Sequence, residues 1–381
     1  MVNEPLRPPP LPARAVCLAA LVTACAVPFC KGASRATSLP ERLRLERYAR
    51  VAGLVVLQAR PSHPLMVMRD GVVGRLDLKT MRVLHGVGTA YSNVVLRHPG
   101  HRPRTVKIFC THPAFSPSGR DFVVLVSVGH QPVSPMELKL RTAWQVWSVA
   151  RGRAIGTLRG QLVPPRGPGR LVYTDGGKKL AGFGGGSLYF LNPRLAARPR
   201  LAGAWGAESF HVVGLRAEPR GPYLLAKCAR PGRAEVWDSR DQRRVVIIPP
   251  PPHASWSPYP PWHAVIRANR VAIAWGHHLA IYRASTGLQL ASLRLGGTCG
   301  RLALAASGGR AAVLVRANAT CAKLEVFNAS AGLTRCAESD PVPVGHVASV
   351  RLAWWGANRV VACAHGWIRI WRVAGRAARD H

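Results

Sequence analysis

The fold is indicated most directly by the stretch Trp367–Trp371, WIRIW, near the end of this 381-residue chain. Apolar and polar side chains alternate along it and it ends on an aromatic residue, as in a strand with one buried face. Three earlier stretches have the same form: RAEVW ending at Trp237, HLAIY ending at Tyr282 and KLEVF ending at Phe327. After each of these three come turn-forming residues and a second apolar run, so the local pattern is strand, turn, strand.

The ends of such stretches recur at a nearly constant interval. Seven positions, which we call the anchor residues, carry an apolar and mostly aromatic side chain: Leu76, Trp147, Leu191, Trp237, Tyr282, Phe327 and Trp371. Successive anchors are 71, 44, 46, 45, 45 and 44 residues apart. A period of this length is typical of a four-stranded propeller blade. We therefore predict an all-β, seven-bladed β-propeller; a β-sandwich would also show alternation but not this regular interval.

The repeats resemble those of the WD-repeat family. The last copy opens with Gly345-His346, and the fourth keeps the name-giving pair as Trp237-Asp238. The second copy carries Phe115–Gly119, FSPSG, which is similar to the turn between the first two strands of a family repeat. The resemblance covers about residues 45 to 373. It implies a rigid ring that binds other proteins.

The copies are degenerate. In the family an Asp six residues before the repeat's Trp ties a tight turn to the His, and here Asp70 alone occupies that place. In the last copy Arg372 replaces the family's terminal Asp. We therefore expect these blades to depend more on apolar packing than on the family's polar network.

The chain is predicted to hold one large domain. Residues 1–40 form a leader, 41–375 the propeller and 376–381 a basic tail. The long interval before Trp147 indicates an enlarged second blade, with insertion loops at 97–104 and 129–141 that are rich in Pro, Gly and charge. A Pro-rich loop at 249–262 joins the fourth and fifth blades. Because the chain ends soon after the third strand of the last blade, we expect the segment Leu43–Val51 to supply the fourth strand and close the ring.

The charge is strongly positive. Lys and Arg number 53 against 17 Asp and Glu, a formal net charge of +36. Such a surface attracts nucleic acid, anionic membranes and acidic proteins through long-range electrostatics. The densest internal cluster comprises Arg230, Arg233, Arg240, Arg243 and Arg244. It is interpreted as a polyanion-binding site or as an ordinary solvated rim, since no aromatic stacking motif accompanies it.

The N-terminal residues are compatible with more than one cellular compartment. Ala15–Cys30 is an uncharged apolar run preceded by Arg7 and Arg14, with a small-residue site at Ala24–Ala26. Residues 1–26 thus resemble a secretory signal, and the run is too short for a membrane span. The main expectation is an intracellular protein of cytoplasm or nucleus, because WD-repeat proteins are overwhelmingly intracellular. Secretion and mitochondrial import are the alternatives.

Catalytic and metal-binding signatures are scarce. Gly182–Ser187, GFGGGS, lacks the Lys and the helix of a phosphate loop and reads as a turn between strands. Asp175–Gly177 is likewise a hairpin signal. His277-His278 has no Cys or acidic neighbour at ligand spacing. We predict no enzyme activity, no cofactor and no metal.

One short motif indicates a class of partner protein. Trp237–Arg240, WDSR, matches the WDxR word of WD-repeat substrate receptors in cullin-RING ubiquitin ligases. The resemblance implies that Asp238 and Arg240 contact the ligase adaptor. The adjacent blade, with Tyr282-Arg283, lacks the second such word that the family usually has. The sequence thus predicts a non-enzymatic scaffold for protein–protein interactions, with a ligase receptor and a nucleic-acid or membrane binder as alternatives.

The compartment is tested by sequencing the N-terminus of the mature protein. An intact N-terminus at Met1, or close to it, in cytosolic or nuclear fractions is the expected result. A mature chain that begins after residue 26 would instead show that the leader is a cleaved secretory signal.

Overall fold

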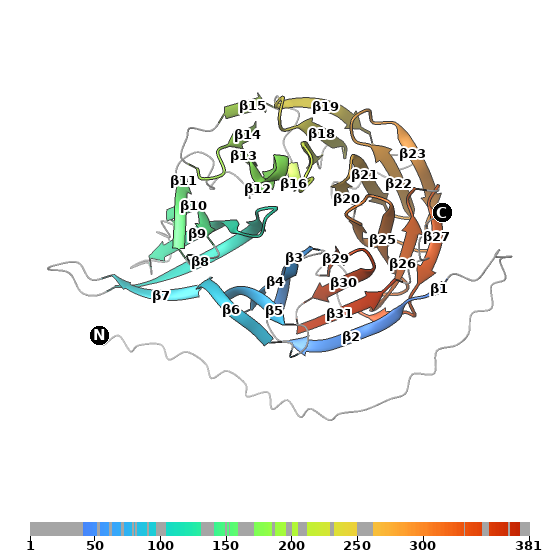
Figure 1. Cartoon of the computed structure of the whole chain (residues 1–381), viewed down its shortest axis with the longest axis horizontal. Helices are drawn as coiled ribbons and strands as arrows, with labels where there is room; N and C mark the ends of the chain where they lie inside the picture. The colour runs from blue at the N-terminus through green and yellow to red at the C-terminus, as the bar shows by residue number, and fades with distance from the viewer. Residues whose placement is uncertain are drawn as a thin grey trace, which may run out of the picture. The chain divides into compact units, whose positions relative to one another are not determined.

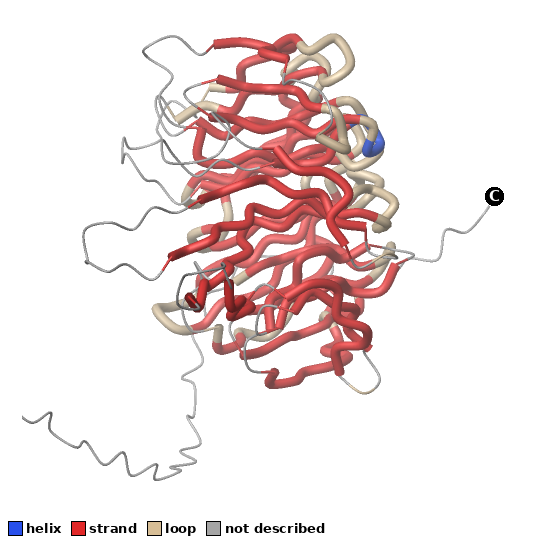
Figure 2. The backbone as a smooth tube through the Cα atoms, turned by 90° about the vertical axis from the view of Figure 1, so that its left-hand side faces the viewer, coloured by secondary structure: helices blue, strands red, loops and turns tan. Residues whose placement is uncertain are grey.

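The computed structural model describes residues 41–373 apart from short gaps. These gaps are 52–53, 61–62, 70–71, 78–79, 81, 90, 97–103, 131–140, 149–150, 152, 159–170, 185–186, 196–199, 205–211, 229–231, 250–261, 331, 345–349 and 365. The leader 1–40, the tail 376–381 and Asp70 lie outside the described residues. The described chain is almost entirely β-structure (Figures 1 and 2). The fold class is thus all-β, as predicted.

The described strands form seven sheets, which we number in chain order. The first contains β3 (Leu54–Arg60), β4 (His63–Arg69), β5 (Val72–Asp77) and β6 (Arg82–Thr89). The second contains β7 (Tyr91–Leu96), β8 (Arg104–Phe115), β9 (Asp121–His130), β10 (Arg141–Ser148) and β11 (Arg153–Leu158). The third contains β12 (Leu171–Thr174), β13 (Lys179–Gly184), β14 (Ser187–Leu191) and β15 (Arg200–Ala204).

The remaining four sheets follow the same plan. The fourth contains β16 (Val212–Ala217), β17 (Tyr223–Cys228), β18 (Ala234–Asp238) and β19 (Arg243–Ile248). The fifth contains β20 (Trp262–Arg267), β21 (Arg270–Trp275), β22 (His278–Arg283) and β23 (Gln289–Arg294). The sixth contains β24 (Cys299–Leu304), β25 (Arg310–Arg316), β26 (Cys321–Asn328), β27 (Thr334–Glu338) and β28 (Val342–Pro343), joined by β1 (Glu41–Arg42). The seventh contains β29 (Arg351–Trp355), β30 (Arg359–Ala364), β31 (Gly366–Arg372) and β2 (Arg44–Val51).

Counted without β7, the additional strand of the second sheet, every anchor residue lies on the third strand of its repeat. Leu76 is in β5, Trp147 in β10, Leu191 in β14, Trp237 in β18, Tyr282 in β22, Phe327 in β26 and Trp371 in β31. In each sheet the third strand pairs antiparallel with the second. The nearly constant interval between anchor residues therefore arises because each anchor lies on the equivalent strand of its sheet.

Alternation along a strand sends side chains to two different neighbours. In β21, Val271 and Ile273 pack with residues of the fourth sheet, whereas Ala272 and Ala274 pack with residues of the sixth. All four are fully buried. Both faces of this sheet are thus covered by other sheets. For this reason β21 has a continuous run of apolar residues instead of an alternation of apolar and polar ones.

The sheets meet side by side through their first strands. Contacts join β3 to β8, β8 to β12, β12 to β16, β16 to β20, β20 to β24, β24 to β29 and β29 to β3. Figure 1 shows these first strands nearest to a common centre, with the fourth strands outside. Gly287 shows how closely neighbouring sheets approach: its φ is +73°, and a Cβ there would lie 2.4 Å from a methyl of Val246 in the fourth sheet.

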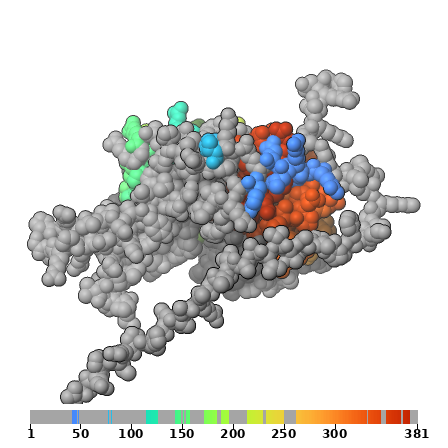
Figure 3. Space-filling view, turned by 90° about the horizontal axis from the view of Figure 1, so that it is seen from below, coloured from blue at the N-terminus to red at the C-terminus, as the bar shows by residue number. Residues whose placement is uncertain are grey.

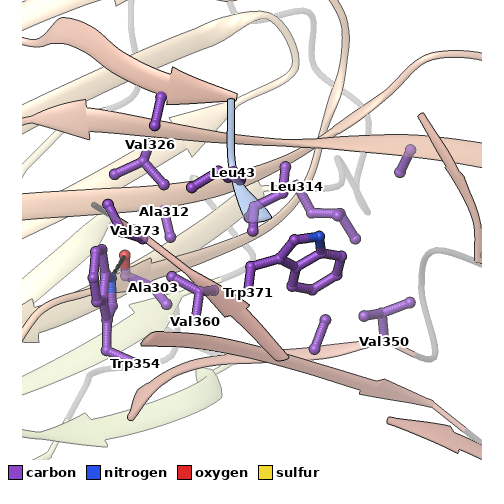
Figure 4. Close-up of a cluster of buried hydrophobic side chains, with 14 of the residues drawn as sticks. Leu43, Ala303, Ala312, Leu314, Val326, Val350, Trp354, Val360, Trp371 and Val373 are labelled. Atoms are coloured by element: carbon purple, nitrogen blue, oxygen red, sulfur yellow. Dashed lines mark hydrogen bonds between the residues drawn. The ribbon is translucent and has the colours of Figure 1, made fainter. Parts of the chain in front are cut away.

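The N-terminal segment joins two sheets. β1 pairs parallel with β27 of the sixth sheet, and β2 pairs antiparallel with β31 of the seventh. Between them Leu43 donates its backbone N–H to Glu338 O at 2.8 Å and buries its side chain among residues of both sheets (Figure 4). Figure 3 shows this segment, in blue, lying across the orange and red surface of the two sheets. We call residues 41–51 the clasp.

Ion pairs hold the clasp from outside. The carboxylate of Glu46 on β2 is 2.7 Å from Nε of Arg359 on β30 and 2.7 Å from Nε of Arg372 on β31. Arg372, which replaces the Asp of the family word, is therefore used here to bind the N-terminal strand.

The second sheet corrects the predicted insertion loops. The sequence predicts loops at 97–104 and 129–141, but β8 begins at Arg104, β9 continues to His130 and β10 begins at Arg141. Residues Tyr91–Leu96 form an additional fifth strand that pairs with β8. Many of the extra residues in the long interval before Trp147 therefore belong to an additional strand and to longer strands. In the same way Trp262, the last residue of the predicted Pro-rich loop, is the first residue of β20.

Replacing Leu43 by Ala tests the contribution of the clasp. Leu43 is 8% exposed, so the substitution removes buried apolar surface between two sheets and should lower the free energy of unfolding by about 2 kcal/mol. Denaturant unfolding measures the change. Leu45→Ala, two residues along the segment at a side chain 45% exposed, is the matched control and should change stability by less than about 0.5 kcal/mol. Equal losses in the two variants would contradict the buried position of Leu43.

Candidate functional site

The WDxR motif forms a turn at the end of β18. The Asp238 carboxylate accepts hydrogen bonds from the backbone N–H of Arg240 at 2.7 Å and of Asp241 at 3.3 Å. Trp237 is buried, and its indole N–H donates to Glu235 at 3.3 Å. Asp238 therefore shapes its own turn, the local role that Asp commonly has at such positions.

Arg240 is tied to the neighbouring sheet. Its Nε lies 3.0 Å from Oδ1 of Asp175, in the turn between β12 and β13, although 61% of its side chain is exposed. This hydrogen bond and the charge of Asp175 raise the pKa of Arg240. Lys179 donates to the carbonyl oxygens of Ser239 at 2.7 Å and Arg240 at 3.2 Å. The motif thus links the third and fourth sheets.

The predicted polyanion cluster is matched with carboxylates. Arg233 and Arg244 lie 2.7 and 3.6 Å from the buried carboxylate of Glu235, and Arg243 lies 3.4 Å from Asp241. Arg230 lies outside the described residues. Much of the local positive charge that the sequence indicates is therefore balanced by acids that lie within a few residues.

A different group of basic side chains lies on the inner strands. It comprises Arg216 on β16, Lys227 on β17, His263 on β20, Arg301 on β24 and Arg351 on β29, and we call it the inner cationic cluster. β16, β20, β24 and β29 are the first strands of four consecutive sheets and contact one another in that order. Arg216 and Arg351 are exposed, whereas the other three are half-buried.

Arg301 spans three sheets. Its Nη1 is 3.3 Å from Nε2 of His263 in the fifth sheet, and its Nε donates to the carbonyl oxygen of Val350, the residue just before β29. Nη1 also donates to the carbonyl oxygen of Gly300 at 3.2 Å. These three acceptors, which come from the fifth and sixth sheets and from the residue just before the seventh, fix the direction of the guanidinium.

Lys227 is held in a similar way. Its ammonium donates to the carbonyl oxygen of Trp262 and lies 4.3 Å from the centre of the Trp262 ring. A cation over the face of a Trp ring is stabilised by the electrons of the ring. Trp262 is itself almost completely buried, so its position is fixed by the core between the fourth and fifth sheets.

The electrostatic field in the cluster is positive. Burial lowers the pKa of Lys227 to about 8, and the charges of Arg301 and Arg216 act in the same direction. Burial, followed by Arg301, Lys227 and Arg216, lowers the pKa of His263 to about 3. The imidazole is therefore neutral at pH 7, which allows Nε2 to accept a hydrogen bond from Arg301.

Sequence reasoning did not find this cluster, because its members are far apart in the chain. Arg216, His263, Arg301 and Arg351 lie between 19 and 26 residues before the anchors of their repeats and Lys227 lies 10 residues before its anchor, too irregularly for a motif. The available signal is the presence of basic or imidazole side chains on four largely apolar first strands, VVGLRA, WHAVIR, CGRLAL and RLAWW. A search for runs of Arg passes over such isolated residues.

The described part of the chain contains no group of three or more His, Cys, Asp or Glu side chains arranged to hold a metal ion. Its helices include none that is long and apolar enough to cross a membrane. Asp175–Gly177 joins β12 to β13 in an antiparallel hairpin, as predicted. Of the GFGGGS stretch, Gly182–Gly184 belong to β13 and Ser187 to β14, which pair antiparallel, so the strands extend further into it than predicted.

Comparison with solved structures identifies the fold. The chain is similar to the β-propeller domain of Cps50 (Swd1) from Myceliophteria thermophila, at 14% sequence identity and a TM-score of 0.57, over 87% of this chain and 100% of that one. It is similar to a chain of the mitotic checkpoint complex at 14% identity and a TM-score of 0.57, over 93% of this chain and 100% of that one. No family model and no curated protein matches the sequence. The fold is therefore a β-propeller, and membership of the WD-repeat family stays a resemblance.

The low pKa of His263 predicts a specific loss of stability in acid. An unfolded His binds a proton near pH 6.5 and the folded His263 only near pH 3, so the unfolded state gains protons, and stability falls, as the pH drops between these values. Replacing His263 by Asn should make the fall in unfolding free energy over this range shallower. Denaturant unfolding at several pH values measures it. His278→Asn, at an exposed position on β22, is the control and should keep the wild-type slope.

Proposed function

We propose that this chain is a non-enzymatic, seven-bladed propeller scaffold, closed by its N-terminal strand, that binds partner proteins inside a larger assembly. The observation that carries the proposal is the inner cationic cluster. Four consecutive sheets each bring charged or imidazole side chains to their inner edge, where they can meet a single partner. A partner docks on the end of the ring that bears this cluster.

The way in which these groups are held supports recognition by fixed charges. Arg301 and Lys227 are oriented by backbone carbonyls, an imidazole and an indole ring, all of them part of the packed framework. Side chains that are already oriented lose little conformational entropy when a partner binds. One of the similar structures, a chain of the mitotic checkpoint complex, is a propeller that works within a protein complex.

The scaffold proposal is tested by recovering the tagged chain from cells of its source at physiological salt, after nuclease treatment. We expect a protein partner to remain bound in a defined ratio and to form a stable complex again when both components are purified and mixed. A chain that is recovered alone after these steps, as a 41.1 kDa monomer, would contradict the proposal. Nuclease treatment is needed because a net charge of +36 retains nucleic acid without specificity.

The ligase-receptor alternative depends on Arg240, which is exposed but paired with Asp175. If this alternative holds, Arg240→Ala reduces recovery of the ligase adaptor several-fold in affinity purification. Arg243→Ala, three residues away on a side chain that is also exposed, is the control and leaves recovery unchanged. Equal recovery of the adaptor by the wild type and by Arg240→Ala would exclude this use of the motif.

The polyanion alternative is less favoured by the contacts. Arg233, Arg243 and Arg244 each lie beside a carboxylate, which reduces the field that a nucleic acid or an anionic membrane would meet there. The overall charge still provides non-specific attraction. An intracellular location in the cytoplasm or nucleus is part of the main proposal, and an N-terminal secretory signal is the alternative.

A further inference from the structure

A cavity of about 290 Å³ lies at the junction between the fifth and sixth sheets. The side chains that line it include Arg270, Arg283, Leu290 and Ser330, which come from β21, the end of β22, β23 and the turn after β26. We propose that this cavity binds the phosphate group of a phosphate ester. The proposal goes beyond the scaffold function and does not rest on it.

The junction between the third and fourth sheets shows how a similar place is filled. Asp175 comes directly after β12 with a φ of +50°, and its carboxylate lies 3.0 Å from Nε of Arg240 in the fourth sheet. Lys179, the first residue of β13, donates to the carbonyl oxygen of Ser239 at 2.7 Å. An acid from one sheet thus fills the space beside a turn of the next sheet and balances the charge there.

The junction between the fifth and sixth sheets has the same backbone arrangement. Ala268 comes directly after β20 with a φ of +46°. Arg270, the first residue of β21, donates from Nη1 to the carbonyl oxygen of Ala329 at 2.8 Å. Ala268 therefore has the place that Asp175 has in the third sheet, and Arg270 has that of Lys179.

The turn of the sixth sheet likewise matches the WDxR turn. The side chain of Asn328 accepts the backbone N–H of Ser330 at 3.0 Å, as that of Asp238 accepts the N–H of Arg240. Ser330 and Arg240 both lie three residues after the anchor of their repeat. The ion pair of the earlier junction is thus replaced by the smaller side chains of Ala268 and Ser330, which leaves space for the cavity.

The acid that this place holds in the two preceding sheets is missing from the fifth. Like Asp175, Glu218 comes directly after the first strand of its sheet, and its buried carboxylate accepts the backbone N–H of Asn269 in the next sheet at 2.8 Å. The fifth sheet has Ala268 at this position. An anion from a ligand can therefore take the place that a carboxylate has at the two earlier junctions.

Arg283 differs from the residues at the same position of other repeats. It comes directly after its anchor, where the third, fourth and sixth sheets have Asn192, Asp238 and Asn328. Each of these three accepts, through a side-chain oxygen, a hydrogen bond from the backbone N–H two residues further on. An arginine has no acceptor atom, so Arg283 cannot cap its turn in this way. Its exposed side chain lines the cavity instead.

These groups suit a phosphate ester. A phosphate group carries a charge of about −1.5 to −2 at pH 7 and several acceptor oxygens, which match two guanidinium groups and the hydroxyl of Ser330. Arginine binds phosphate through parallel N–H donors, and Arg270 keeps donors for a ligand beside the one that contacts the sixth sheet. Leu290, which is 36% exposed, adds an apolar wall. An ester with an apolar group should therefore bind more tightly than inorganic phosphate.

The proposal is tested with purified full-length protein and phenyl phosphate, by isothermal titration calorimetry at physiological salt. Arg283→Gln removes a charge-assisted hydrogen bond and should weaken binding at least about tenfold. Arg294→Gln, at the opposite end of β23, removes the same charge from another exposed position and should bind within about twofold of the wild type. Phenol, which lacks the phosphate, should bind at least about tenfold more weakly than phenyl phosphate.

A second pair of variants returns the missing acid to the junction. Ala268→Asp places a carboxylate where Asp175 stands in the third sheet, so it should compete with the ligand and weaken binding of phenyl phosphate at least about tenfold. Ala268→Asn is the neutral control and should bind within about twofold of the wild type. Asp and Asn both tolerate the positive φ of this position, so both variants should fold, and thermal unfolding checks this.

Two results would overturn the proposal. One is binding of phenyl phosphate to Arg283→Gln with the affinity of the wild type. The other is equal binding to Ala268→Asp and Ala268→Asn, because the anion would then gain nothing from the uncompensated charge of the cavity.

A phosphopeptide decides where the phosphate comes from. If a nonapeptide with a central phosphotyrosine binds at least about tenfold more tightly than phenyl phosphate, and loses this binding in Ala268→Asp, the ligand is a phosphorylated side chain of another protein. Equal affinity of the two probes assigns the cavity to a small phosphate ester. Both tests use purified protein and defined probes, so their outcome is independent of whether a partner protein is captured from cells.

Discussion

Apolar packing between neighbouring sheets is the interaction on which the rest of the structure depends. A sheet such as the fifth is apolar on both faces, because Ile273 points to one neighbour and Ala272 and Ala274 to the other. It can be buried only if a sheet lies on each side, and the same is true of that neighbour. Every sheet in such a set has a neighbour on both faces only when the sheets are arranged in a closed ring. Leu43 and β2 add to this packing, since Leu43 is buried among residues of the sixth and seventh sheets and β2 pairs with β31.

The same packing sets the electrostatics of the inner edge. Once the sheets stand side by side, their first strands converge, and any charged side chain on such a strand is brought close to its counterparts on the next sheets. Arg301 consequently meets His263 and Val350, which are 38 and 49 residues away in sequence. Within the seventh sheet, by contrast, Arg359 on β30 and Arg372 on β31 are matched with Glu46 on β2. The positive charges of the inner edge are thus brought together by the packing of different sheets.

The sequence predicts the repeated part of the structure well and the connections between repeats poorly. The anchors could be placed on third strands because packing repeats the same environment every blade, and the strand Leu43–Val51 could be assigned because an unpaired edge is costly. The fifth strand β7 could not be separated from loop, since Pro and Gly around it mask a short run of β-formers. The contact of Arg240 with Asp175 and the inner cationic cluster depend on how side chains of different sheets meet, and a period in sequence carries no information about that.

The clasp also has a consequence for how the protein is made. Glu46 and Arg359 are 313 residues apart, so their ion pair and the strand pairing around it can form only after all the intervening residues have been synthesised. Long-range pairing of this kind slows folding, and strand edges that wait for a partner favour aggregation. During synthesis β2 is made long before its partner β31. Until β31 emerges, the edge of β2 lacks the strand with which it pairs in the folded protein, a condition that favours aggregation.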